Sequence, residues 1–386
     1  MKRTFIFVAM ALMLAGSLAF ADEATIIDFT ILDADIITEK DADGNEVTNA
    51  NGEAVYTQNS RTIMDFGTAA GATFTDDQKA LMKTSLSLPN WEVILNSSAQ
   101  NVYSNTYSQV VAAPVRTEKP NPKGGDAVPV NLPFAGKNIM GVRIIFPHGN
   151  YNANAKIIPP YEIPAYEKLR SVDENGNLQE QTAEEAASGK TRFEDGYGIV
   201  KNVGAIKALS LTTQGMLFPH RVWVLLKDTD NVERRYLMGD LGFDGWKELT
   251  WKNPAYMQEI RKREIRIVPI YPRGLPFVKF TGLLITRDAM HDGDDFIGYF
   301  KDVKMIYDKA VLHTERDIAD EDLWGIVGKR EADKQNYEMS KFGNKQVNRF
   351  IEKTKLAQEE AFTSSLSDAE AEGGNGGNAG PSVDAK

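Results

Sequence analysis

The chain has 386 residues, of which 42% are hydrophobic, and this is enough to bury one large core or two ordinary ones. Its formal net charge is -10, and an acidic surface repels both phosphate backbones and anionic lipid, so neither nucleic acid nor a membrane surface is expected as a partner. The chain contains no cysteine, which excludes disulfides, thiolate catalysis and zinc sites built on sulfur.

The N-terminus has the pattern of a secretory signal peptide over residues 1–21. Two basic residues precede an apolar run that ends in a small-x-small pattern at Ala19 and Ala21. The run is too short to span a bilayer comfortably, and no second such run follows it. We therefore expect cleavage before Asp22, a soluble mature chain with no membrane insertion, and a location in the periplasm or beyond.

From residue 22 to residue 313 the sequence predicts β-strands joined by turns and loops. About nine or ten stretches have the alternation or the aromatic and β-branched content of strands. They cover residues 26–29, 91–96, 142–146, 206–212, 222–226, 232–238, 246–251, 265–271, 277–286 and 296–307. Long loops are expected at 114–136 and 147–164, and a short helix at 75–87. Since the strands do not alternate with predicted helices, we expect a mainly β fold, an antiparallel β-sandwich or jelly roll.

The stretch 220–251 predicts how such strands connect. Two alternating runs flank a polar turn at 228–231, whose short side chains bond their own backbone and favour a reversal. Gly239, Gly242 and Gly245 then permit a tight corner before a third strand. A hairpin followed by a glycine corner and a further strand is typical of an antiparallel sandwich.

The sequence carries no motif for catalysis, for a cofactor or for a metal. The four histidines lie far apart and outside any ligand spacing, and neither GxSxG nor GxxxxGK[ST] occurs. The densest acidic cluster, at 291–295, is interpreted as a solvated turn before a strand. We therefore expect a protein that is not an enzyme and that uses no cofactor.

Trp246, Trp251 and Tyr256 are candidates for an interface or for contact with a glycan. Flat aromatic side chains stack against the apolar faces of pyranose rings. However, Trp246 and Trp251 are five residues apart, so in a regular strand they point to opposite faces and form no common platform. Packing in the core is the alternative for at least one of the three, and anchoring a protein interface is another.

From residue 314 to residue 362 the composition predicts one or two amphipathic helices. The segment has few glycines and no proline, and it is rich in Glu, Lys and Gln. Because so polar a helix cannot bury itself alone, its apolar stripe either packs on the sandwich or contacts another subunit. The candidate assembly face comprises Trp324, Tyr337, Phe342, Val347 and Phe350. A glycine-rich, disordered tail is expected at 363–386.

Several sequence blocks resemble a known family. They are the signal peptide, WEVILNSSA from Trp91, RFEDGYGIVKNVG from Arg192, LMGDLGFDGWKELTWKNPAY from Leu237, IGYFKDVKMIYDKAVL from Ile297 and ERDIADEDLWGIVGKREA from Glu315. In this order they span nearly the whole mature chain. Together they are similar to the FlaA-type outer-layer, or sheath, proteins of spirochaete periplasmic flagella.

The resemblance implies a structural subunit that is exported to the periplasm and laid on a core of flagellin beside other sheath subunits, either further copies or paralogues. It also implies a sandwich like that of a carbohydrate-binding module, no catalytic residue, and an effect on filament stiffness or shape and on motility. A signal peptide fits lateral assembly, because flagellin normally travels through the hollow flagellum without one. The alternative is a periplasmic carbohydrate-binding protein with a glycan site at the aromatic residues above.

Overall fold

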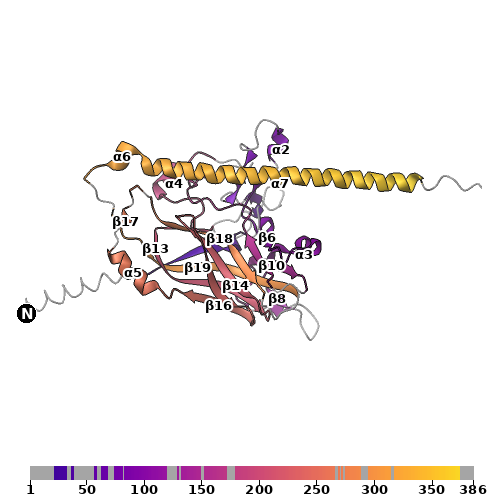
Figure 1. Cartoon of the computed structure of the whole chain (residues 1–386), viewed down its shortest axis with the longest axis horizontal. Helices are drawn as coiled ribbons and strands as arrows, with labels where there is room; N and C mark the ends of the chain where they lie inside the picture. Colours follow the sequence, from indigo (N-terminus) through magenta and orange to yellow (C-terminus); the bar gives the residue numbers. More distant parts are fainter. Residues whose placement is uncertain are drawn as a thin grey trace, which may run out of the picture. The chain divides into compact units, whose positions relative to one another are not determined.

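The computed structural model describes residues 21–32, 36–38, 56–58, 62–67, 74–80, 82–119, 128–129, 132–148, 152–171, 179–265, 268–269, 271–272, 274–287, 294–313 and 317–373 (Figure 1). Two compact units divide the chain. The first holds the described residues up to Met64 and from Thr84 to Glu338, and the second those from Asp65 to Lys83 and from Met339 onward. Nearly all of the predicted signal peptide and the last part of the predicted tail lie outside the described residues.

One sheet of the first unit has the strand order β16-β13-β19-β10-β7, and β1 pairs with β19 beside it. Its strands are β1 (Asp22–Asp28), β7 (Gln109–Pro114), β10 (Asn138–Phe146), β13 (Val203–Met216), β16 (Asp244–Lys252) and β19 (Asp294–Lys309). Every neighbouring pair is antiparallel. The long strands β13 and β19 therefore form the middle of this sheet.

The other sheet of the first unit has the order β15-β14-β18-β11-β6, and β12 also pairs with β18. Its strands are β6 (Glu92–Leu95), β11 (Asn154–Ile158), β12 (Ile199–Lys201), β14 (Arg221–Asp228), β15 (Glu233–Asp240) and β18 (Phe277–Thr286). These pairs are antiparallel as well. Strand β18 is central in this sheet, and eight of its ten residues are buried.

Aromatic rings join the two sheets in one core. His220, at the entrance to β14, stacks on Phe146 of β10 with ring centroids 5.4 Å apart, and it lies 4.9 Å from the ring of Phe296 in β19. All three side chains are buried. The residue that leads into β14 of one sheet thus packs among rings of the other sheet, as facing sheets require. The predicted mainly β, antiparallel sandwich is confirmed.

The predicted hairpin and glycine corner are also present. The turn after β14 places Asn231 at a φ of 66°, and the Val232 amide donates to the Asp228 carboxylate at 3.0 Å. Gly239, near the end of β15, and Gly245, at the start of β16, have φ values of 149° and 86°, which favour glycine. Strand β16 then pairs with β13. The corner therefore carries the chain from one sheet to the other.

Helices, 3-10 turns and short strands complete the described chain. The helices are α2 (Asp76–Ala80), α3 (Val102–Tyr107), α4 (Ala183–Ser188), α5 (Tyr256–Ile265), α6 (Asp320–Trp324) and α7 (Ile326–Gly373), with 3-10 turns at Phe29–Ile31 and Leu88–Asn90. The short strands are β2 (Ile36–Thr38), β3 (Tyr56–Gln58), β4 (Met64–Asp65), β5 (Lys83–Thr84), β8 (Glu118–Lys119), β9 (Val128–Pro129), β17 (Val268–Pro269) and β20 (Leu312–His313).

The predicted loop at 147–164 contains the strand β11, which differs from the expectation. Ala155 and Ile157 of β11 are fully buried and alternate with less buried neighbours. The strand has only five residues, so its alternation is too short to stand out between flanking Asn and Pro residues. The predicted loop at 114–136 likewise contains the short paired strands β8 and β9.

Two other segments have a different structure from the predicted one. The stretch expected as a strand at 265–271 instead begins with the end of α5, whose charged and long side chains are good helix formers, and continues into β17. The helix expected at 75–87 ends at Ala80. Leu86 and Leu88 are fully buried, and their packing in the core outweighs the helical preference of the residues before them.

The C-terminal helix α7 continues to Gly373, past residue 362, where the sequence predicts a tail. Residues 363–372 contain Ala, Glu and Ser but no glycine or proline, so nothing breaks the helix before Gly373. The boundaries predicted for the three segments after the signal peptide remain predictions. In the described part of the chain, no helix is long and apolar enough to cross a membrane.

Candidate functional site

The strand β1 begins at Asp22, the residue before which signal cleavage is predicted. Asp22 pairs with Tyr307 of β19, and its carboxylate lies 2.9 Å from the Lys309 ammonium. The hydrogen bond and the negative charge of Asp22 raise the pKa of Lys309. Ala21 directly precedes the strand, whereas Ala19 lies outside the described residues. A chain cut before Asp22 would start at the first residue of a paired strand.

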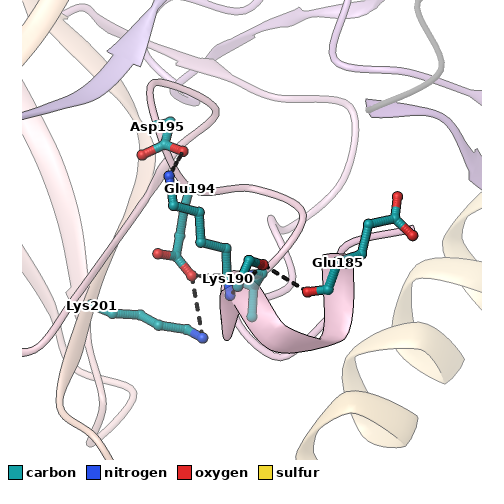
Figure 2. A network of polar contacts seen from close by, with 7 residues as sticks. Glu185, Lys190, Glu194, Asp195 and Lys201 are labelled. Carbon is teal, nitrogen blue, oxygen red and sulfur yellow. Dashed lines mark hydrogen bonds and ion pairs between the residues drawn. The ribbon is translucent and has the colours of Figure 1, made fainter. Parts of the chain in front are cut away.

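The turn between α4 and β12 is fixed by two ion pairs, which Figure 2 shows. Lys190 Nζ lies 2.8 Å from Asp195 Oδ2, and Lys201 Nζ lies 3.2 Å from Glu194 Oε1. The same Glu194 oxygen accepts a hydrogen bond from the Thr191 amide at 2.7 Å. The charged residues of this sequence block therefore shape a turn, and they do not converge on a common ligand position.

This turn also holds the N-terminal strand. The Asp28 amide donates to the Gly196 carbonyl at 2.9 Å, and the Gly198 amide donates to the Ile26 carbonyl at 2.7 Å. Both glycines have positive φ values, 96° and 115°, which other residues adopt at a cost. The sequence block from Arg192 therefore contains the two glycines whose backbone holds β1 in place.

A cluster of buried charges lies where β18 meets the start of α7. The Lys279 side chain is 2% exposed, and its ammonium lies 2.8 Å from both Glu162 Oε1 and Glu338 Oε1. The Lys227 ammonium also lies 2.7 Å from Glu162 Oε1. Burial alone would raise the pKa of Glu162, but hydrogen bonds from Lys227 and Lys279 outweigh it and lower the pKa to about 2. Glu338 of α7 is therefore held to the sandwich by an ion pair with the buried Lys279 ammonium.

Further contacts hold the first turns of α7 within the first unit. Arg330 Nη1 donates to the Pro272 carbonyl at 2.6 Å. The Lys334 ammonium lies over the ring of Tyr166, 5.4 Å from its centroid. The start of the C-terminal helix is thus part of the sandwich domain.

Two residues of the predicted assembly face are packed inside the second unit. Phe342 is 5% exposed, and its ring lies 5.5 Å from that of Phe66, edge to face. The Phe350 ring lies 5.8 Å from that of Phe74 in a similar arrangement. These side chains stabilise the second unit and are not presented as an open stripe.

The other residues of that predicted face are more accessible. Trp324, at the end of α6, is 66% exposed, and Tyr337 of α7 is 68% exposed. Val347 is half-buried. Exposed large aromatic side chains are typical anchors of protein interfaces, so Trp324 and Tyr337 remain candidates for assembly.

The two tryptophans of β16 lie in different surroundings. The register of β16 against β13 continues without a shift from Asp244 to Lys252, so Trp246 and Trp251 point to opposite faces. Trp246 packs edge to face on Phe134 at 4.9 Å, and Trp251 packs on Tyr236 of β15 at 4.7 Å. They form no common platform.

Tyr256 is anchored at the start of α5. Its hydroxyl donates to Asp308 Oδ2 at 2.7 Å, and the Lys207 ammonium lies 5.7 Å from the centroid of its ring. Both partners come from the central strands β13 and β19. Tyr256 therefore fixes α5 to the sheet.

A groove of about 740 Å3 lies between the two sheets and includes Trp251. Its floor is apolar, with Val203, Leu226 and Val278 all nearly buried. Tyr236 and Trp251 form aromatic walls, and both are half-buried. An apolar floor with aromatic walls and a polar rim is common in small-molecule sites.

The sequence did not single out Tyr236 or the helix α3. Tyr236 occupies an ordinary position in β15, and nothing in its local sequence indicates that it lines a groove. On α3, Val102, Tyr103 and Tyr107 are strongly exposed, and the two tyrosine rings lie 4.7 Å apart. A cluster of tyrosines in the segment 102–107 was the available signal for a surface patch.

Among the described residues, no three His, Asp or Glu side chains come together in a way that could hold a metal ion. The acidic segment at 291–295 is described only from residue 294. There, Asp295 Oδ2 forms an ion pair of 2.5 Å with Arg143 across the β10–β19 ladder. Asp295 therefore contributes to a cross-strand pair.

Solved structures of β-sandwich carbohydrate-binding modules are distantly similar to the chain. One, titled "Structural basis for the promiscuous specificity of the carbohydrate-binding modules from the beta-sandwich super family", has 10% identity and a TM-score of 0.26, with 68% of this chain and 71% of that chain covered. Another, of TmCBM61 in complex with β-1,4-galactotriose, has 10% identity and a TM-score of 0.23, covering 56% and 88%. Scores this low support no argument about fold or ligand.

Sequence comparison is decisive. The family described as "Flagellar filament outer layer protein Flaa" matches residues 55–316. Flagellar filament outer layer proteins of Treponema pallidum and Spirochaeta aurantia are 48% and 40% identical to the chain, over 95% and 94% of it and 97% and 95% of their own lengths. One from Borreliella burgdorferi is 29% identical over 64% of this chain and 62% of its own. The chain belongs to the family of FlaA flagellar filament outer layer proteins.

Proposed function

We propose that the chain is a structural subunit of the outer layer, or sheath, of a periplasmic flagellar filament, where it coats a core of flagellin. The observation that carries this proposal is near-full-length similarity to outer layer proteins of spirochaetes. A protein of an outer layer must associate with filament components. Coating adds material at the filament surface, where it has the largest effect on bending, so the layer would change stiffness, helical shape and motility.

The start of the fold supports export by a cleaved signal peptide. Strand β1 begins at Asp22 and is paired from its first residue. Cleavage before Asp22 would remove the apolar segment without removing any residue of the sheet. A subunit delivered to the periplasm in this way reaches the filament from its side and not through its channel.

A sheath subunit needs at least two kinds of contact, one to the core and one to its neighbours. Heterologous contacts that do not close into a ring generate a helical array. The exposed aromatics Trp324 and Tyr337 and the exposed tyrosines of α3 offer surfaces for such contacts. Their partners would be flagellin subunits and other sheath subunits, either copies of this chain or paralogues.

The proposal is tested by electron microscopy of filaments purified from cells that lack the chain. These filaments should be thinner over the lengths that the chain normally covers, and a plasmid copy should restore the diameter. A plasmid copy without residues 1–21 is the matched control and should not restore it. Filaments of unchanged diameter and shape would contradict an outer-layer role.

A further inference from the structure

The groove between the sheets opens where β14 turns into β15 and where β16 leads to α5. Trp251, near the end of β16, forms one wall, and Tyr236 of β15 forms the other. Both residues share the inward-facing side of their strands with buried neighbours, Leu249 and Met238. Such positions are normally closed off by the opposite sheet. Here the two aromatic side chains are only half-buried, because the sandwich is open at this end.

The two rings form a corner with unused hydrogen-bonding capacity. Their centroids are 4.7 Å apart and their planes meet at 68°. Within the described residues, neither the Tyr236 hydroxyl nor the Trp251 indole N–H has a hydrogen-bond partner in the protein. Burial is the main cause that raises the pKa of Tyr236. When such rings are withdrawn from water, their polar tips usually find a partner, and here a ligand hydroxyl can provide it.

The charges around the groove are balanced. Its lining contains three acidic and three basic residues: Asp228, Asp230, Glu259, Lys227, Arg234 and Arg235. Arg234 lies 3.4 Å from the Asp228 carboxylate, and Lys227 is held by Glu162 outside the groove. The lining therefore attracts neither an anion nor a cation strongly. It offers many donors and acceptors to a neutral, polar ligand.

We propose that this groove binds a neutral oligosaccharide, with one pyranose ring in the corner formed by Tyr236 and Trp251. The apolar C–H face of the ring would stack on the indole, and the equatorial hydroxyls would bond to the Tyr236 hydroxyl and to the carboxylate and guanidinium groups of the rim. The volume of about 740 Å3 is sufficient for a short oligosaccharide. This site does not depend on the sheath role.

A saccharide fits the groove better than a peptide side chain does. An apolar side chain would cover the floor but leave the Tyr236 hydroxyl, the Trp251 N–H and the charged rim without partners, and unmet polar groups oppose binding. A pyranose has both an apolar face and a periphery of hydroxyls. The combination of flat aromatic walls and a balanced polar rim therefore favours the sugar.

The test is calorimetric titration of the purified protein with cellohexaose and chitohexaose, with an oligogalacturonate as the anionic probe, while tryptophan fluorescence is followed in parallel. At least one neutral probe should bind saturably and change the fluorescence. Trp251→Ala and Tyr236→Ala should each weaken binding at least roughly tenfold. Trp246→Ala, on the opposite face of β16, is the matched control and should bind like the parent.

Conservative variants separate recognition from folding. Trp251→Phe keeps a flat ring and should retain most of the binding, and Tyr236→Phe should lose only the contribution of the hydroxyl, a few-fold at most on the order of one neutral hydrogen bond. Absence of saturation by both neutral probes up to about 10 mM would overturn the proposal. It would also be overturned if the oligogalacturonate bound more tightly than the neutral probes, or if Trp246→Ala weakened sugar binding as much as Trp251→Ala does. A Trp251→Ala variant that no longer binds filaments, from a parent that binds no sugar, would likewise overturn it.

Discussion

Gly282 of β18 lies where the backbone of β11 passes too close for a side chain. Its φ is 152°, and a Cβ atom there would lie 2.3 Å from the Ile157 carbonyl oxygen. Because a backbone atom of a paired strand cannot yield easily, Gly282→Ala should lower the free energy of unfolding by about 3 kcal/mol or more. Urea unfolding measures this loss.

Gly189 provides the matched control. It has a φ of 61° at the end of α4, but a Cβ atom there would meet nothing within 4 Å. Gly189→Ala should therefore cost only the conformational strain, about 1 kcal/mol. Equal losses in the two variants would show that the contact with Ile157 does not limit the residue at position 282.

The Glu162 carboxylate makes stability depend on acid. Its pKa is lowered from the ordinary 4.5 to about 2 in the folded chain, so the folded state favours the charged form more than the unfolded state does. That stability is present above about pH 4.5 and is lost as the pH falls toward about 2. Glu162→Gln should be less stable at neutral pH, and its stability should fall less steeply across this window. Parallel curves for parent and variant in acid urea titrations would contradict the assignment.

At the scale of elements, α7 combines two environments in one continuous helix. Its first turns are tied to the sandwich through Glu338 and Lys279, whereas Phe342 packs on Phe66 in the second unit. Phe342→Ala removes a buried ring and should destabilise the second unit by about 3 kcal/mol. Amide hydrogen exchange should accelerate around residues 66 and 342.

Tyr337→Ala is the control for that variant, because Tyr337 lies on the same helix but is 68% exposed. Its removal should change stability by no more than about 0.5 kcal/mol. If both variants accelerated exchange equally, or if Phe342→Ala left it unchanged, the packing of Phe342 would not stabilise the second unit.

The elements that the sequence predicts well are those with strong local patterns. Strand β18 matches its expected limits because eight of its ten residues are aromatic, β-branched or leucine. The glycine corner was likewise predictable, since positive φ selects glycine. The strand expected at 265–271 overlaps the end of α5 at Ile265, and β11 was not expected because its alternation is short.

The candidate surfaces were harder to predict than the strands. Period-two spacing placed Trp246 and Trp251 on opposite faces, but it could not show that Trp251 meets Tyr236 from the other sheet. The apolar positions of α7 predicted a stripe, but not that Phe66 and Phe74 pack against Phe342 and Phe350. Pairings between residues far apart in sequence depend on topology, which local patterns do not encode.

At the scale of the whole molecule, the chain is a mainly β protein of a structural family whose members form an outer layer of the flagellar filament. Two family relatives align along nearly the full length of the chain. The open groove and the exposed aromatics of α3, α6 and α7 are the features of this chain that an assembly or a ligand can use.

Cosedimentation of the chain from Asp22 onward with purified flagellin core filaments tests the central claim most directly. We expect saturable pelleting with filaments, at a fixed ratio of subunit to flagellin, whether or not insoluble polysaccharide also retains the protein. Trp251→Ala should pellet with filaments like the parent. Pelleting with polysaccharide but not with filaments would contradict the sheath role and leave carbohydrate binding as the function of the fold.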